Sequence, residues 1–94
     1  MNTPKTFVKT DKDRLLSELF ELLRIPSISA DSAYAENVKE AASWLEKKLK
    51  AIGLKTVDIY QTSGHPIVYG ETEQVAGRPT VLVYGHYDVQ PPDP

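Results

Sequence analysis

Hydrophobic residues in the first third of the chain recur at helical spacing. Spacings of three and four positions dominate in residues 15–25, which predicts a helix with a wide apolar face. Thr10 followed by Asp13 is a candidate capping box at its start, and Pro26 ends it because a residue before proline is pushed out of the α region. Residues 1–9 lack this pattern, and we expect a flexible arm there. The apolar residues of this helix are Leu15, Leu16, Leu19, Phe20, Leu22, Leu23 and Ile25.

A second apolar stripe at helical spacing follows the loop after Pro26. Asp31 or Ser32 can cap the helix that this stripe predicts, and Gly53 is its expected C′ residue. Lysines crowd the last turns, where they suit the negative end of the helix dipole. The stripe comprises Ala35, Val38, Ala41, Ala42, Leu45, Leu49 and Ile52.

The remaining residues show strand patterns. Residues 54–62 alternate between apolar and polar side chains, and residues 67–73 form a second short β-rich segment. Residues 80–86 are a continuous run of β-formers, which is typical of a central strand buried on both faces beneath helices. Two helices followed by three strands predict an α/β fold, with residues 1–94 as the opening part of one layered domain.

Composition narrows the classes of function. The chain has 94 residues and a net charge of −2, which gives no electrostatic case for binding nucleic acid or an acidic membrane. It contains no cysteine, so disulfides and thiolate metal sites are excluded and any metal must be held by His, Asp or Glu. The polar N-terminus lacks the apolar core of a signal peptide. We therefore expect a soluble, cytoplasmic protein.

Candidate chemistry lies at the end of the third predicted strand. His86 and Asp88 are two positions apart, so their side chains point to the same face, and open α/β sheets place their chemistry beyond the carboxyl ends of strands. A carboxylate on one imidazole nitrogen fixes the tautomer and leaves the other nitrogen free for a metal. Gly85 permits a turn or a close approach, and prolines 91, 92 and 94 end any ladder.

The pair is also compatible with a structural role, since hydrogen-bonded histidines are common at strand ends. One imidazole and one carboxylate cannot hold a catalytic zinc, which needs three protein ligands and a water. His65 lies in a turn, where we expect a structural role, and Asp93 could reach a metal only through a bend. Tyr87 should face away from the pair and pack under a helix. The loop serines 27, 29 and 32 have no paired base, which argues against a serine nucleophile.

The segment TVLVYGHYDVQPPDP, residues 80–94, closely resembles the zinc-ligand segment of the M20 family of metallopeptidases, in its dipeptidase-like branch. An apolar strand runs there into a G-H-x-D-V-x-P motif. Upstream segments agree in order and spacing, namely ELLRIPSISAD, VKEAASWLEKKLKAIGLKT and SGHPIVYGE. The resemblance covers about residues 12–94 and implies the start of a zinc-exopeptidase-like catalytic domain.

The resemblance implies a role for each residue of the motif. His86 would be a ligand of one of two zinc ions, and Asp88, counted with the catalytic residues, would orient His86 and raise its basicity. In the family, paired metals polarise the scissile carbonyl and lower the pKa of the attacking water. The implied substrates are short peptides or, as an alternative, N-acyl amino acids.

The family's other metal ligands, its general-base glutamate and its lid domain lie beyond the segment that this chain resembles. We therefore expect the 94-residue chain to be inactive alone. The alternative is a non-catalytic α/β module. Missing neighbours would leave an apolar strand edge and helix faces uncovered, so we expect a homo-oligomer.

Overall fold

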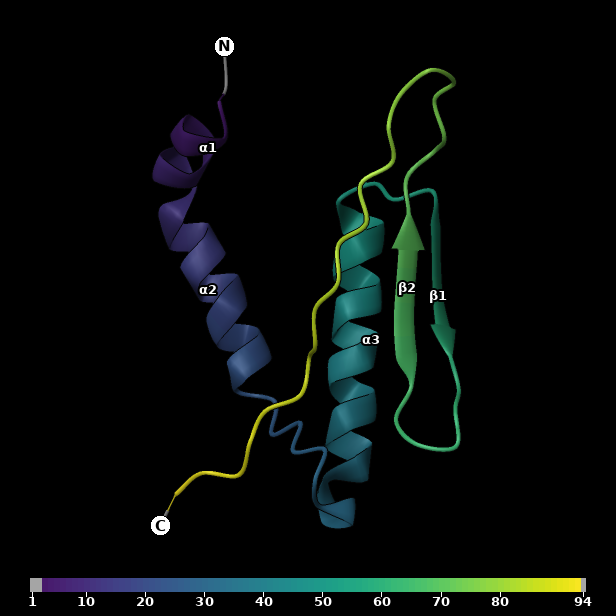
Figure 1. The fold of residues 1–94 in the computed structure, drawn as a ribbon. Coiled ribbons are helices and arrows are strands. Elements are labelled where there is room, and N and C mark those ends of the chain that lie inside the picture. Colours follow the sequence, from purple (N-terminus) through teal and green to yellow (C-terminus); the bar gives the residue numbers. More distant parts are fainter. Residues whose placement is uncertain (1–2, 94) are drawn as a thin grey trace.

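The computed structural model describes residues 3–93 as three α-helices, one short 3₁₀ helix and a two-stranded antiparallel sheet. Helix α3 packs on the hairpin, and α1 and α2 lie on the other side of α3 from the strands (Figure 1). This arrangement confirms the α/β character of the chain. The elements are α1 (Pro4–Thr10), α2 (Lys12–Leu23), η1 (Ser32–Tyr34), α3 (Ala35–Ala51), β1 (Thr56–Tyr60) and β2 (Ile67–Glu71).

Helix α1 replaces most of the arm expected at residues 1–9. The Thr3 side chain accepts a hydrogen bond from the Thr6 backbone N–H at 3.1 Å, and Pro4 occupies the first turn, where its missing N–H is harmless. Residues 1–2 lie outside the described part of the chain. None of the residues of α1 is buried, so the helix rests on local capping more than on packing.

Helix α2 forms where the periodicity predicts it, but its start differs. Asp11 is the N-cap residue and its side chain makes no capping hydrogen bond, so the predicted Thr10–Asp13 capping box is wrong. Asp11 instead pairs with the Arg14 guanidinium at 2.7 Å, an arrangement that the acidic side chain can adopt without capping the helix. The helix ends at Leu23, ahead of Pro26, as predicted.

The core is formed by α3, which packs on the hairpin, and by Ile25 and Ile28 of the segment after α2. Val38, Ala41 and Ala42 of α3 are buried, and their small size permits a close approach to β1 and β2. Gly70 of β2 permits a close approach, since a Cβ there would lie 2.7 Å from the Leu54 side chain and 3.3 Å from that of Leu49 in α3. At the end of α3, Gly53 adopts the positive φ of 93° that its predicted C′ position favours.

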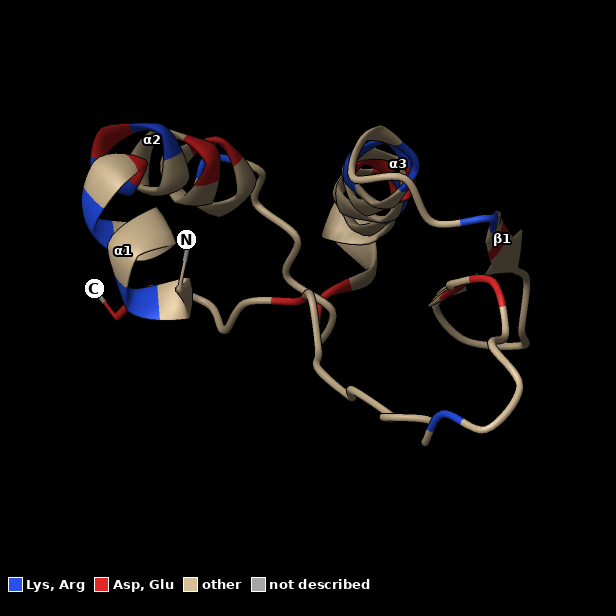
Figure 2. Ribbon diagram, turned by 90° about the horizontal axis from the view of Figure 1, so that it is seen from above, with Lys and Arg blue, Asp and Glu red and all other residues tan. Residues whose placement is uncertain are grey.

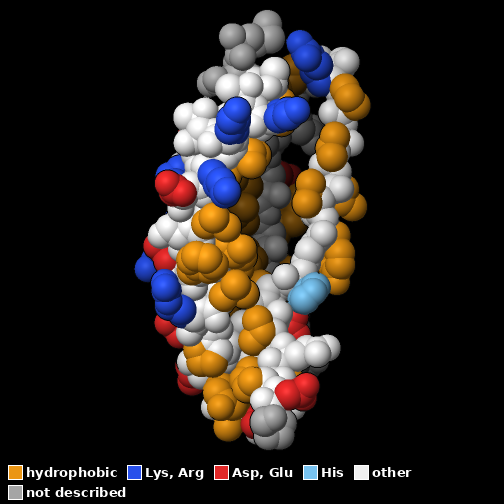
Figure 3. Space-filling view, turned by 90° about the vertical axis from the view of Figure 1, so that its left-hand side faces the viewer, with side chains coloured by type: hydrophobic (Ala, Val, Ile, Leu, Met, Phe, Trp, Pro, Cys, Tyr) orange, Lys and Arg blue, Asp and Glu red, His pale blue; other side chains and the backbone are white. Residues whose placement is uncertain are grey.

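The third predicted strand is absent from the described residues. Residues 81–84 are 81–90% exposed, although their sequence is the most apolar of the chain. A buried strand needs neighbours on which to satisfy its N–H and C=O groups, and residues 3–93 supply none beside this run. Figure 3 shows hydrophobic side chains uncovered along the C-terminal stretch. The sequence has no Asp, Glu, Lys or Arg between Arg78 and Asp88, and the extended stretch is accordingly tan over most of its length in Figure 2.

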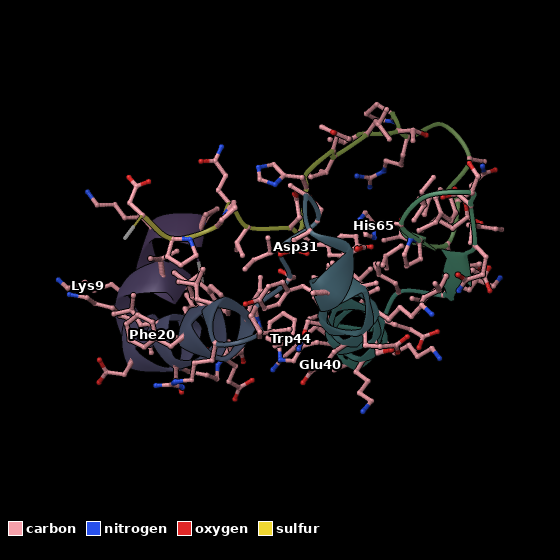
Figure 4. All side chains as sticks on the ribbon, turned by 90° about the horizontal axis from the view of Figure 1, so that it is seen from below. Lys9, Phe20, Asp31, Glu40, Trp44 and His65 are labelled. Carbon is pink, nitrogen blue, oxygen red and sulfur yellow. The ribbon has the colours of Figure 1, made fainter. Side chains whose placement is uncertain are left out.

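Helix α2 keeps much of its apolar face uncovered, since Leu16, Leu19, Phe20 and Leu23 are all exposed. Its link to α3 is polar: the Trp44 indole N–H donates to the Glu21 carboxylate at 3.2 Å. Trp44 accordingly points from α3 toward α2 (Figure 4). No helix within residues 3–93 has the length and apolar character needed to cross a membrane.

Candidate metal site

The candidate site is built where the loop after α2 meets the end of the C-terminal stretch. Ile28 and Val89 form an isolated parallel β-bridge, and the Val89 N–H donates to the Ser27 carbonyl at 3.0 Å. The Ser27 hydroxyl donates to the Tyr87 carbonyl at 3.1 Å. Ser27 is fully buried and Ile28 nearly so, which protects these bonds from water. We call residues 26–29 and 87–89 together the clamp.

Backbone hydrogen bonds between residues two apart fold the chain around Pro26 into a tight turn. The Ser27 N–H donates to the Ile25 carbonyl at 2.7 Å and the Ile28 N–H to the Pro26 carbonyl at 2.8 Å. Bonds of this short range occur in tight turns at the ends of regular elements. They leave the carbonyl of Ser27 free to receive Val89.

His86 and Asp88 meet as their spacing predicts. The His86 Nδ1 lies 2.8 Å from Asp88 Oδ1. Because an ionised carboxylate only accepts, this contact assigns the proton of the neutral ring to Nδ1 and leaves the Nε2 lone pair free. The His86 side chain is 78% exposed and that of Asp88 is 39% exposed, so Nε2 is accessible.

Asp88 has a second partner that the sequence analysis missed. The Ser29 hydroxyl donates to Asp88 Oδ2 at 2.5 Å, within the range for a hydroxyl on a carboxylate. The Ser29 hydrogen bond, and after it the His86 ring, hold the pKa of Asp88 below its usual value. Neither loop serine is paired with a base, as the sequence predicts: Ser29 donates to a carboxylate and Ser27 to a carbonyl. Only the short run of polar side chains after Pro26 could have signalled these contacts.

Tyr87, which lies between His86 and Asp88, contacts the loop before β2. Its hydroxyl donates to the Pro66 carbonyl at 2.5 Å, so it packs beside the loop before β2 and not under a helix as expected. Partial burial, and after it the Asp88 charge, raise the pKa of the Tyr87 phenol. The contact ties the C-terminal stretch to the loop before β2.

His65 joins the hairpin loop to the clamp. Its Nε2 lies 2.9 Å from the Ser29 carbonyl, which can only accept, so Nε2 carries the proton. Figure 4 shows His65 turned from the hairpin loop toward the middle of the molecule. The contact fits the structural role expected for this residue.

A hollow of about 470 Å³ adjoins the His86–Asp88 pair. Val38 of α3, Val68 of β2 and Val83 of the C-terminal stretch line it together with His86 and Asp88. Within residues 3–93, no group of three or more His, Cys, Asp or Glu side chains could hold a metal, and Asp93 is therefore not gathered into a ligand cluster. The structure thus assembles one imidazole, its carboxylate partner and a neighbouring hollow.

Comparison with known proteins relates this segment to dipeptidases. The chain is 33% identical to a Cys-Gly metallodipeptidase of Candida albicans over 92 residues, which cover 85% of the chain and 19% of that protein. It is also 33% identical to a cysteinylglycine-S-conjugate dipeptidase of Corynebacterium striatum over 81 residues, 86% of the chain and 18% of the relative. A Cys-Gly metallodipeptidase of Saccharomyces cerevisiae is 31% identical over 99 residues, which cover 90% of the chain and 21% of that protein.

The chain is a homologue of metallodipeptidases. The resemblance to the amino-terminal part of such enzymes is thereby confirmed, and the chain spans about a fifth of the length of the curated relatives it matches. No protein-family model matches the sequence, and no solved structure matches it.

Proposed function

We propose that this chain is part of the catalytic domain of an M20-family zinc dipeptidase, in which His86 binds the metal and Asp88 orients His86. The observation that carries the proposal is the 2.8 Å contact between His86 Nδ1 and Asp88 Oδ1, which leaves Nε2 accessible. Metal-binding histidines commonly donate their other ring N–H to a carboxylate, and this one has that arrangement. The metallodipeptidase relatives support the same assignment.

The residues fit one position of a metal site. An accessible neutral imidazole suits Zn²⁺, and Asp88 fixes both the tautomer and the ring orientation. A catalytic zinc takes three protein ligands, and the described residues gather no such set. We therefore propose that the 94-residue chain supplies a single ligand and does not hydrolyse peptides alone.

When bound, zinc supplies Lewis-acid polarisation of the scissile carbonyl and lowers the pKa of a water molecule. The chain's own residues prepare for this. Asp88 accepts a hydrogen bond from His86 Nδ1, the clamp fixes the backbone of Asp88, and the hollow adjoins the His86 side chain.

The proposed substrates of the complete protein are dipeptides or short peptides cleaved at an amide bond. Two of these relatives are named for Cys-Gly and one for a cysteinylglycine S-conjugate, which favours a dipeptide over an N-acyl amino acid. The sequence-based expectations of a cytoplasmic protein without nucleic-acid or membrane partners stand as part of this proposal.

The metal assignment is tested by titrating the 94-residue chain with zinc and following the ring resonances of both histidines by NMR. We expect zinc to shift the His86 ring signals in wild type and in the matched control His65→Ala, and to leave the His65 ring signals in place. His86 signals that do not respond to zinc, or a response confined to the His65 ring, would contradict the assignment.

The catalytic assignment is tested in a hybrid enzyme. We would place this chain in the Corynebacterium relative in place of the segment it matches, and measure zinc-dependent hydrolysis of a cysteinylglycine S-conjugate. Activity in the hybrid that is lost in His86→Ala and retained in His65→Ala supports the proposal. Equal activity of the folded hybrid and its His86→Ala variant would refute it. The free chain should show no hydrolysis in the same assay.

A further inference from the structure

We propose that Ser29 is a positioning residue that locks the Asp88 carboxylate and thereby sets the tautomer and direction of the His86 ring. The inference rests on the proposed function for its purpose, but its geometry and its test do not require a metal. It assigns a role to a residue from the loop after α2, 59 positions away in sequence from the carboxylate it contacts.

The two oxygens of Asp88 are used separately. Oδ1 accepts from His86 Nδ1 at 2.8 Å, and Oδ2 accepts from the Ser29 hydroxyl at 2.5 Å. A carboxylate held through one oxygen can still rotate about the bond to its Cβ atom, since that torsion is broad. Two donors on opposite oxygens fix the carboxylate plane and therefore the line along which His86 donates.

Ser29 can serve as an anchor because its own backbone is held on both sides. Its neighbour Ile28 is bridged to Val89, and its own carbonyl accepts from His65 Nε2 at 2.9 Å. Ser29 thus stands between the two histidines, with its carbonyl bound to one and its hydroxyl bound to the carboxylate of the other. The clamp and the hairpin loop both contribute to its position.

Ser29 is not placed as a nucleophile. Its hydroxyl proton is directed to Asp88 Oδ2, and the His86 nitrogen nearest to that carboxylate is already a donor to Oδ1. A serine nucleophile needs a base that accepts its proton, and a carboxylate that already accepts from a histidine and stays ionised is a poor one. The hydroxyl therefore acts on the metal ligand through Asp88.

The consequence is a preference for the Nδ1–H tautomer of His86. Without the Ser29 hydroxyl, Asp88 keeps one partner and can turn away, and the His86 ring can exchange its proton to Nε2. The Nε2 lone pair would then be lost to a metal in that fraction of molecules. Groups behind a metal ligand typically change metal affinity about 10–100-fold when removed, and we expect a smaller loss of about three- to tenfold for Ser29, which acts one step further out.

The experiment measures the tautomers of both histidines in the metal-free 94-residue chain by ¹⁵N NMR, at about pH 8, where an ordinary imidazole is neutral. Wild type should show His86 mainly as Nδ1–H and His65 mainly as Nε2–H. Ser29→Ala should raise the Nε2–H fraction of His86 severalfold, while Ser29→Thr, which keeps the hydroxyl, should restore the wild-type pattern. His65 is the internal control, because its partner is the Ser29 backbone carbonyl.

Three results would separate the possible failures. Retention of the Nδ1–H form in folded Ser29→Ala would overturn the positioning role. Loss of the Val89 amide signal in Ser29→Ala would mean that the clamp is disrupted, and Ser29→Thr then decides. With an intact Val89 signal, a changed His86 tautomer in Ser29→Thr would overturn the positioning role. The wild-type tautomer in that variant would support the role. A tautomer change without any zinc response in wild type would uphold the role of Ser29 and refute the proposed metal function.

Discussion

Residues 80–86 and residues 87–89 belong to one extended stretch, yet the first part is exposed and the second is half-buried against the loop after α2. The first part is almost wholly apolar and pairs with no strand among residues 3–93, whereas the second contains Asp88 and is held by the loop after α2. Burial along this stretch therefore follows the available hydrogen-bond partners and not hydrophobicity. His86 stands at the boundary, with an exposed ring and a fixed carboxylate partner.

The largest expected effect comes from breaking the held part. Ile28→Ala removes a nearly buried side chain from the clamp, and large-to-small changes of this kind destabilise by about 2–5 kcal/mol. We expect the lower part of that range because the surrounding core is small. Urea unfolding gives the free energy, and amide hydrogen exchange at Val89 should accelerate with it.

The control for this variant is Ile52→Ala, which removes the same side chain from an exposed position. It should change the free energy of unfolding by less than about 0.5 kcal/mol. Equal destabilisation by the two variants would show that the clamp is not the better packed region.

The next effect separates hydrogen bonding from packing in the same region. Ser27→Ala leaves the Tyr87 carbonyl without its buried donor, and an unsatisfied buried group costs about 1–3 kcal/mol. We expect the free energy of unfolding to fall by about 1–2 kcal/mol. Ser17→Ala, at an exposed site on α2, is the matched control and should be nearly neutral. An unchanged free energy of unfolding in Ser27→Ala would show that the hydroxyl of Ser27 does not help to hold residues 87–89.

The unheld part should respond in association instead of stability. Leu82 is 89% exposed, so Leu82→Lys should leave the free energy of unfolding within about 0.5 kcal/mol of wild type. A charge on an exposed apolar strand suppresses pairing with other chains, and we expect weaker self-association in sedimentation velocity. Gln74→Lys adds the same charge to an exposed loop and should not weaken association. A wild-type chain that stays monomeric at all concentrations would contradict the predicted oligomer.

The same comparison explains how far the sequence could predict the structure. Helices α2 and α3 and the hairpin follow from periodicity, because each can form its hydrogen bonds with its own residues or its neighbours in sequence. The run 80–86 also has a clear strand pattern, but a strand forms only beside another strand with which it can exchange hydrogen bonds. Residues 3–93 offer no such strand next to this run.

The candidate site divides along the same line. The contact between His86 and Asp88 follows from their spacing of two residues, whereas the contacts of Ser27 and Ser29 span 60 and 59 positions. A single sequence carries no signal that pairs residues at such distances. Helix α1 was missed for another reason, since its Thr3–Pro4 start is a recognisable cap but no apolar periodicity follows it.

The smallest expected effect concerns the hairpin. Its two strands pair with each other along their full length, which makes it the counterpart of the unpaired run 80–86. The Tyr69 hydroxyl donates to the Glu71 carboxylate at 2.7 Å, and this hydrogen bond raises the pKa of Tyr69 above its ordinary value of about 10. Since the raised pKa belongs to the folded state, its contribution to stability is present below about pH 10 and is lost as the pH rises through the pKa of Tyr69. Glu71→Gln removes the negative charge and should lower the pKa of Tyr69, measured by ultraviolet phenolate absorbance against Tyr69→Phe. Glu73→Gln, which neutralises the partner of Lys55 nearby, is the control and should leave the phenolate titration unchanged. A titration of Tyr69 that ignores Glu71→Gln would show that this hydrogen bond does not persist in solution, even where the strand has its neighbour.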